Sequence, residues 1–343
     1  MRTAKHPFSI PAGEPAAVWI RRKALSALAA LALACVAGPL LAQTTYPNKT
    51  VKLIVPFPPG GGNDVIGRVI AQKLTDRWGQ TVVVENRAGA NGIVGLQALT
   101  QAAPDGYTLA VGAAGPLAVN PSLYARLPYD PLKDFTPITN LVNFPLLLVT
   151  HPSVPAKNVR ELVAFAKAKP GQLSYASPGS GNSGHLAGEL FNTMAGVQTV
   201  HIPYKGQGPA LTDLVAGQVQ MLYSSIPSVI QQVRNGQLRG LAVGSAKRLP
   251  SLPDIPTLSE SGVPGYEAYS WVGLVAPANT PADIVRKIQR DVADILSDKE
   301  VADKLNQQGA LPVGDTPEEF TLYIKNEIVK WGKVVRDANI KAD

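Results

Sequence analysis

Three glycine-rich segments carry the residues best suited to bind a ligand. They are residues 58–64 (Pro-Pro-Gly-Gly-Gly-Asn-Asp), 177–185 (Ser-Pro-Gly-Ser-Gly-Asn-Ser-Gly-His) and 204–209 (Tyr-Lys-Gly-Gln-Gly-Pro). Glycine lets a ligand approach the backbone closely, and the start of a following helix offers unpaired N–H groups at the positive end of its dipole. Each segment is therefore suited to bind a small anion, and we expect a carboxylate.

Patterns for catalysis and for metal binding are weak. Residues 60–62 are not followed by the Gly-Lys-Ser/Thr of a nucleotide-binding loop. Ser183 stands in Gly-Asn-Ser-Gly-His, which differs from a nucleophile elbow because His185 occupies the place of the final glycine. His185 and Glu189 are one helical turn apart, but no third candidate metal ligand is close in sequence. We therefore predict no catalytic residue, no metal and no cofactor.

Two alternatives stay open. The chain could be a hydrolase of small esters or amides, using Ser180 or Ser183 as the nucleophile and His185 or His201 as the base. It could also be a surface adhesion protein, which would need no pocket. Incubation with generic esters and amides separates the first alternative from a binding protein, because a binding protein returns its ligand unchanged.

The glycine-rich segments sit within an alternation of strand and helix patterns. A first set of apolar strands is expected at 51–56, 81–85 and 107–112, with helices at 64–78 and 92–102. A second set has strands at 173–176, 198–203, 219–224 and 238–243, with helices at 158–169, 183–195, 208–216 and 228–235. Such alternation is typical of a parallel sheet with helices on both faces. At the carboxyl ends of such strands, the glycine-rich turns would face one cleft.

The remaining chain predicts a return to the first lobe. Residues 250–264 are rich in proline and form a crossover, followed by a strand at 271–276 and helices at 281–297 and 316–338. We therefore expect an α/β protein with two lobes, each a doubly wound sheet with flanking helices. The predicted division is a signal peptide at 1–42, lobe 1 (first part) at 43–142, lobe 2 at 143–250, and the crossover and return to lobe 1 at 251–343.

The first residues predict export. Basic residues 21–23 precede an apolar run, 24–41, and the small residue Ala42 follows it. This order is typical of a cleaved secretory signal. We expect cleavage after Ala42. A twin-arginine signal, a lipid at Cys35 and a membrane anchor are the alternatives.

Removal of the signal changes both the charge and the cysteine count. Residues 1–42 contain five basic residues and one acidic residue, so the net charge falls from +7 to +3. This small excess gives no reason to expect a nucleic-acid partner. The only cysteine, Cys35, leaves with the signal, so the mature chain can occupy an oxidising compartment without disulfides.

The sequence resembles the substrate-binding proteins of tripartite tricarboxylate transporters, known as the Bug family. The resemblance covers the chain from about residue 46 onward. The matching segments are 55–62 (Val-Pro-Phe-Pro-Pro-Gly-Gly-Gly) with Asp64, 84–87 (Val-Glu-Asn-Arg), 103–109 (Ala-Pro-Asp-Gly-Tyr-Thr-Leu), 127–131 (Leu-Pro-Tyr-Asp-Pro) with Asp134 and Phe135, 203–206 (Pro-Tyr-Lys-Gly) with Pro209 and Ala210, and 238–243 (Leu-Arg-Gly-Leu-Ala-Val).

The resemblance implies a periplasmic-binding-protein-like fold of two lobes and a small organic acid held mainly by backbone groups and ordered water. It implies delivery of the ligand to the permease subunits of a tripartite transporter, or to a sensor protein. It places these residues around the ligand: Phe57, Gly61, Gly62 and Asp64; Ser177, Gly179, Gly181, Asn182, Ser183 and His185; Tyr204, Lys205 and Gly206. Asn182-Ser183-Gly184 departs from the order usual in the family, which puts its side-chain contacts in doubt more than its backbone contacts.

Overall fold

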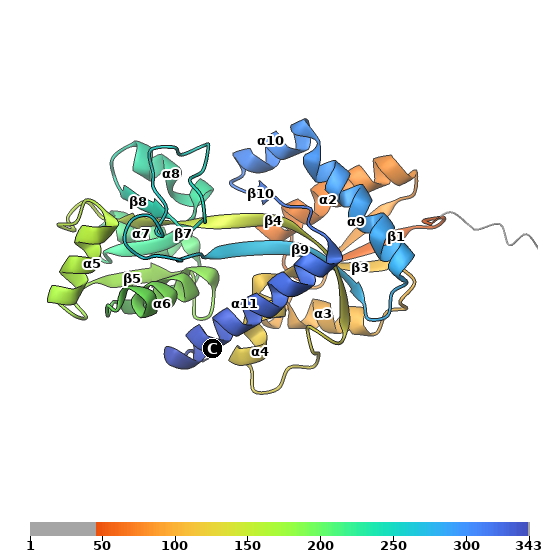
Figure 1. Ribbon diagram of the computed structural model, residues 1–343, viewed down its shortest axis with the longest axis horizontal. Helices are drawn as coiled ribbons and strands as arrows, with labels where there is room; N and C mark the ends of the chain where they lie inside the picture. Colours follow the sequence, from red (N-terminus) through yellow and green to blue (C-terminus); the bar gives the residue numbers. More distant parts are fainter. Residues whose placement is uncertain (1–45, 342–343) are drawn as a thin grey trace, which may run out of the picture. The chain divides into compact units, whose positions relative to one another are not determined.

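The structure, a computed structural model, describes residues 46–341 (Figure 1). The predicted signal, residues 1–42, lies outside the described residues. Within them, the expected alternation of strands and helices is present.

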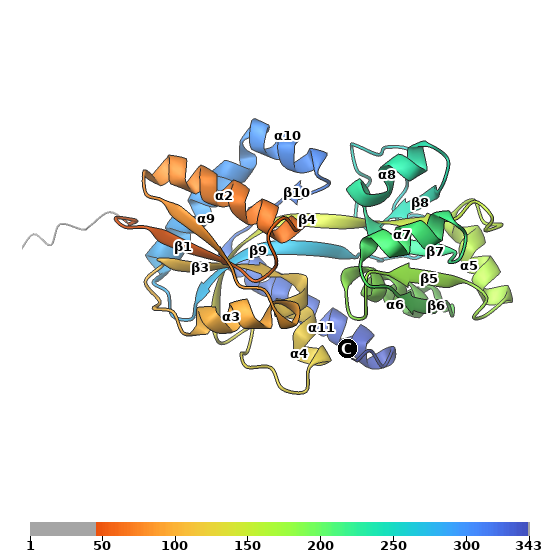
Figure 2. The ribbon, with the colours of Figure 1, turned by 180° about the vertical axis from the view of Figure 1, so that it is seen from behind.

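The first lobe is built from the N-terminal elements and the C-terminal return. The N-terminal elements are β1 (Val51–Val55), α2 (Gly62–Trp78), β2 (Val82–Asn86), α3 (Ile93–Thr100), β3 (Thr108–Ala113) and α4 (Asn120–Leu123). The returning elements are β9 (Tyr269–Pro277), α9 (Ala282–Ser297), α10 (Lys299–Gln307), β10 (Leu311–Pro312) and α11 (Pro317–Asp337). Helices α2 and α9 cover one face of the sheet, and α3 and α11 cover the other (Figures 1 and 2).

The second lobe follows the predicted pattern closely. Its elements are α5 (Val159–Ala168), β5 (Ser174–Ser177), α6 (Ser183–Ala195), β6 (Val200–Pro203), α7 (Gln207–Val215), β7 (Met221–Ser225), α8 (Ile226–Arg234) and β8 (Arg239–Val243). The helices form because the chain supplies both periodic apolar residues and caps. In α6, for example, the Asn182 side chain accepts hydrogen bonds from the N–H groups of Gly184 and His185.

One strand, β4 (Phe135–Thr150), was not predicted. Its first part pairs antiparallel with β9, and from Leu146 onward it pairs with β7 and β8. Pro137 lies at a register shift, and Pro145 is the last residue that pairs with β9. Proline has no N–H to donate to a ladder, so it is tolerated at bulges and at changes of partner. The two prolines interrupt the strand pattern in the sequence, so this strand of 16 residues was not recognised.

The sheet is mixed, so the expectation of parallel sheets was wrong in part. The strand order is β2-β1-β3-β9-β4-β7-β5-β6, and β8 and β10 also pair with β4. β1 runs parallel to β2 and β3, and β5 runs parallel to β6 and β7, as expected. Strands β4 and β9 are antiparallel to their neighbours because they carry the chain between the lobes. The boundary at residue 142 falls inside β4, and the proposed division of the chain stays a prediction.

A continuous apolar core also joins the lobes. It extends from the first sheet to α11, and α11 contacts α6 of the second lobe. Trp331 and Val335 of α11 and Leu190 and Phe191 of α6 all belong to this cluster and are buried. Helix α11 therefore braces the two lobes on one side of the sheet (Figures 1 and 2).

Candidate functional site

Two adjoining chambers are lined from both lobes. The larger chamber has a volume of about 370 Å³ and the smaller about 130 Å³. The larger is lined by Gly62, Asn63, Phe144, Leu146, Pro178, Asn182, Ser183, Gly184, Gln207, Tyr223, Ser224, Ser225, Pro227, Ser270 and Gln308. Both chambers share Asn63, Asn182, Ser183 and Ser270, which form the junction between them.

The starts of four helices contribute to the larger chamber. Gly62 is the first residue of α2, Ser183 of α6 and Gln207 of α7, and Pro227 is the second residue of α8. The first N–H groups of a helix have no partner within the helix and lie at the positive end of its dipole. The four helix starts therefore give this chamber a positive potential without any cationic side chain.

Charged side chains do not line either chamber. Among residues 46–341, no Asp, Glu, Lys, Arg or His belongs to the lining of the two chambers. Likewise, the described part of the chain has no cluster of three or more His, Cys, Asp or Glu that could hold a metal ion. The site is thus suited to bind an anion through backbone N–H groups, amides and hydroxyls.

The first glycine-rich turn supplies Phe57 and Gly62 to the chambers, together with Asn63, which sequence reasoning missed. Gly61 is the N-cap of α2 and does not line either chamber. The residue of this turn with a left-handed backbone is Gly60, with φ of 81°, and φ of Gly62 is not positive. A Cβ added at Gly62 would meet no atom within 4 Å.

Asp64 organises the first turn and does not line the chambers. Its buried carboxylate accepts hydrogen bonds from the Gly60 N–H (2.9 Å), from Arg68 Nε (2.8 Å) and from Asn86 Nδ2 (2.8 Å). The bond from Arg68 is the main reason why the pKa of Asp64 falls to about 2, although burial opposes it. All these bonds fix the loop that precedes α2.

We predict that Asp64→Ala is less stable than the parent protein at pH 7, by about 1–2 kcal/mol after allowance for the half-exposed Arg68. The native pKa lies below the unfolded value of 3.8, so this contribution is complete above that value and disappears as the pH falls through about 2. Urea unfolding at pH 7 and at pH 2 measures it. An equal difference at both pH values would contradict the assignment.

The second turn places Gly181, Asn182 and Ser183 in the chamber walls. Ser177 and His185 are buried beneath it, and Gly179 also lies outside the lining. These three residues therefore shape the turn.

Two stacked histidines support the second turn. The His185 ring lies 3.6 Å from the His201 ring at an interplanar angle of 9°. His185 Nδ1 accepts the Gly181 N–H at 3.0 Å, and His201 Nε2 lies 2.6 Å from Ser177 Oγ. Burial, and then His201, lower the pKa of His185 to about 3, so its ring is neutral near pH 7. Neutral His185 thereby holds the Gly181 backbone in place.

The geometry does not favour the hydrolase alternative. Within residues 46–341, no hydrogen bond joins Ser180 or Ser183 to a histidine. Two other Ser–His pairs are present among these residues: Ser177 with the partly buried His201, where the serine is fully inaccessible, and Ser153 with His151, which line neither chamber. A nucleophile needs access to its substrate.

The third turn contributes through its neighbour. Tyr204, Lys205 and Gly206 do not line the chambers, whereas Gln207 does. Tyr204 Oη donates to Asp213 Oδ2 at 2.8 Å, which directs this ring along α7. Gln207 Nε2 donates to Ser224 Oγ at 2.8 Å, which connects this turn to the end of β7.

The part of the larger chamber that β7 and β9 line, where no glycine marks the turn, was not identified from the sequence. Ser224 and Ser225 end β7, directly before α8, and Ser270 lies on β9. The junction of β7 and α8 is a strand-to-helix turn like the others, so its position was the available signal. Gln308 follows α10, and no strand-to-helix turn in the sequence marks its position.

Two α/β lobes joined by long strands, with a cavity lined from both, define the architecture of a periplasmic solute-binding protein. A family model described as tripartite tricarboxylate transporter family receptor, TctC, matches residues 66–340. BugT of Bordetella pertussis is 40% identical over 312 residues, which cover 91% of this chain and 95% of BugT. The chain therefore belongs to the family of tripartite tricarboxylate transporter receptors, and the predicted resemblance is confirmed.

Solved structures agree with this family. Rpa4515 of R. palustris, solved with adipate, is 38% identical with a TM-score of 0.73, covering 86% of this chain and 99% of that chain. MatC from Rhodopseudomonas palustris, solved with bound malate, is 34% identical with a TM-score of 0.68, covering 84% and 100%. Across residues 46–341, no helix combines the length and the apolar character needed to cross a membrane.

Proposed function

We propose that this protein captures a small organic carboxylate in the periplasm and delivers it to the permease subunits of a tripartite tricarboxylate transporter. The observation that carries the proposal is the convergence of four helix starts on a chamber without charged side chains. Adipate and malate, present in the related structures, are both small carboxylates, which supports this ligand class. The protein acts by binding, without enzymatic turnover.

Backbone groups supply the binding energy in this proposal. A hydrogen bond to a charged group contributes about 1.5–3 kcal/mol, and a helix dipole contributes about 0.3–1 kcal/mol, or up to about 2 kcal/mol in a partly buried site. Three such contacts with their helix dipoles sum to about 5–12 kcal/mol before the cost of association, a range that includes the roughly 8 kcal/mol of micromolar affinity. Neutral donors also avoid the desolvation of a buried cation.

We predict that a small carboxylate raises the melting temperature by several degrees. Ligand at about 100 times Kd adds roughly 2.7 kcal/mol to the free energy of unfolding. A thermal-shift panel of mono-, di- and tricarboxylates measures this. For each acid that raises the melting temperature, the corresponding amide is the uncharged control. If no carboxylate stabilises the protein, the proposed ligand class is wrong.

The absence of turnover is tested separately. Chromatography of the ligand after long incubation with the protein should show the ligand unchanged, and conversion to a product would show an enzyme instead.

A separate prediction concerns export. The basic, apolar and small residues that end at Ala42 predict that protein isolated from the periplasm begins at Gln43. Sequencing of the mature N-terminus measures this. A mature chain that begins with a lipid-modified Cys35 would contradict it.

A further inference from the structure

The smaller chamber is lined by a group of apolar side chains that the larger chamber does not share. Aromatic and aliphatic residues from both lobes and from α11 supply six of its fourteen lining residues. These apolar residues are Phe57, Ala113, Ala114, Val119, Leu186 and Trp331. These six side chains offer an apolar group of the ligand a surface to pack against.

The polar groups around the smaller chamber are already paired, apart from those at the junction. Asn91 Nδ2 donates to Asn120 Oδ1 at 2.8 Å. Trp331 Nε1 donates to Glu327 at 2.7 Å, and Tyr269 Oη accepts the Ala246 N–H at 3.0 Å. The walls therefore present apolar surfaces, including aromatic rings, to a ligand.

The junction offers the free hydrogen-bonding groups. Within the part of the chain that the structure describes, the side chains of Asn63, Ser183 and Ser270 have no hydrogen-bond partner, and all three line both chambers. Asn63 and Ser183 also belong to the first turns of α2 and α6. The junction is thus the position where an anionic head group finds both free polar side chains and helix dipoles.

The volume of the smaller chamber limits what can enter it. Its volume is about 130 Å³. An apolar protein cavity of about 150 Å³ holds one benzene molecule. The chamber therefore has room for about one six-membered ring, and a fused pair of rings would exceed it. Aromatic walls add about 0.5–1.5 kcal/mol for each well-placed ring contact.

We propose that the ligand is a monocyclic aromatic carboxylate. Its ring occupies the smaller chamber, and its carboxylate lies at the junction of Asn63, Ser183 and Ser270. This inference rests on the proposed function, since it assumes a carboxylate ligand, and it adds the class of the attached group. The carboxylate lies where the larger chamber begins, and the rest of that chamber is left for a polar or anionic substituent on the ring.

Calorimetric titration of the exported protein with benzoate, phenylacetate, adipate, malate and citrate tests the proposal, with benzyl alcohol as the ring without a charge. The expected result is that an aromatic acid binds at least tenfold more tightly than each aliphatic acid, and that it changes the fluorescence of Trp331. If aliphatic acids bind as well as or better than both aromatic acids, the ring assignment is overturned and the proposed function stands. If none of these carboxylates binds, both are overturned.

Two variants locate the ring. Ala114→Leu fills the smaller chamber and should weaken aromatic acid binding at least tenfold, whereas Ala164→Leu on the exposed face of α5 should not change it. Phe57→Ala enlarges the chamber and should improve the binding of 1-naphthoate relative to benzoate at least tenfold. This gain cannot arise from misfolding. If Phe57→Ala binds both acids in the same ratio as the parent protein, the ring does not occupy this chamber.

Discussion

Gly62→Leu is expected to lose at least 100-fold in ligand affinity while the protein keeps its cooperative melt. Gly62 begins α2, lines the larger chamber and has no atom within 4 Å of the position of an added Cβ. The Cβ of a leucine there meets no clash, and φ at this residue is not in the left-handed region. The added side chain would cover the N–H groups at the start of α2 and exclude the carboxylate.

Stability and affinity should separate cleanly in this variant. Leucine is more favourable than glycine in a helix by up to about 1 kcal/mol, so unfolding should not become easier. Gly106→Leu is the control, because Gly106 has φ of 80° and another residue there costs about 1 kcal/mol or more. This control should lower the melting temperature and leave calorimetric affinity unchanged. Undiminished affinity in Gly62→Leu would mean that the ligand binds outside the larger chamber.

The local elements could be predicted well because their signals are local. Helix α11 is an example: its predicted start at Thr316 is the N-cap, and Thr316 forms a capping box with Glu319. Helix α10 (Lys299–Gln307) was missed because it buries only Val301 and Leu305, which is too short an apolar pattern to identify. Strand β4 was missed because Pro137 and Pro145 interrupt its apolar pattern; the first lies at a register shift and the second where the pairing with β9 ends.

The site could be predicted only where glycine marks it. Two of the three turns that the glycines mark line the chambers themselves, but the walls from β7 and β9 depend on pairing with β4 over long sequence distances. Asp64 was expected to contact the ligand, yet it binds Arg68 four residues later in the same helix. That spacing is the usual one for a helical ion pair and was visible in the sequence.

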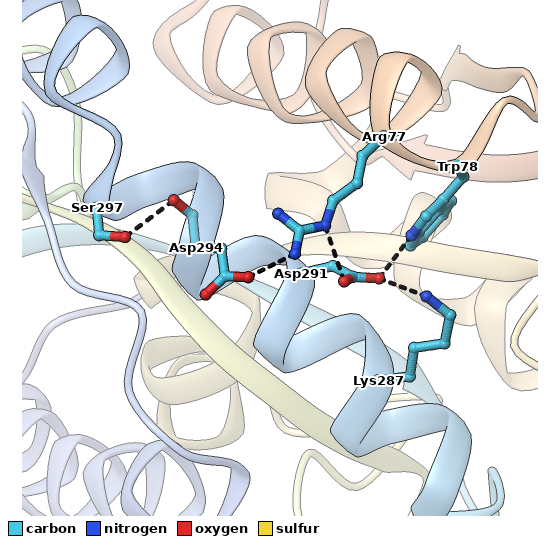
Figure 3. A network of polar contacts seen from close by, with 6 residues as sticks. All are labelled: Arg77, Trp78, Lys287, Asp291, Asp294 and Ser297. Carbon is cyan, nitrogen blue, oxygen red and sulfur yellow. Dashed lines mark hydrogen bonds and ion pairs between the residues drawn. The ribbon is translucent and has the colours of Figure 1, made fainter.

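Rigid supports hold the helices that face the chambers. At the far end of α2, Arg77 Nε and Trp78 Nε1 donate to the two oxygens of Asp291 on α9, at 2.9 and 2.7 Å (Figure 3). Lys287 Nζ donates to the same carboxylate at 2.7 Å, and Asp294 accepts from Arg77. Burial alone would raise the pKa of Asp291, but these bonds lower it. The network fixes α2 on α9, so the Gly62 end of α2 is held in place.

Glu327 is expected to be the most sensitive support. It is 3% exposed, and its Oε2 accepts both Trp271 Nε1 at 2.9 Å and Trp331 Nε1 at 2.7 Å. Trp271 belongs to β9, which runs between the lobes, and Trp331 belongs to α11 and to the wall of the smaller chamber. One buried carboxylate therefore connects strand β9, helix α11 and the wall of the smaller chamber.

Glu327→Ala should lower the free energy of unfolding by roughly 3–5 kcal/mol, because it leaves two buried indole N–H groups without an acceptor and also opens a cavity. Glu327→Gln keeps one acceptor oxygen and should lower it by about 1–2 kcal/mol. Asn326→Ala, at an exposed position on the same helix, should change it by less than about 0.5 kcal/mol. Urea unfolding followed by tryptophan emission measures all three. If Glu327→Ala unfolds at the same urea concentration as Asn326→Ala, the carboxylate contributes nothing to the brace, and apolar packing between α11 and α6 joins the lobes without it.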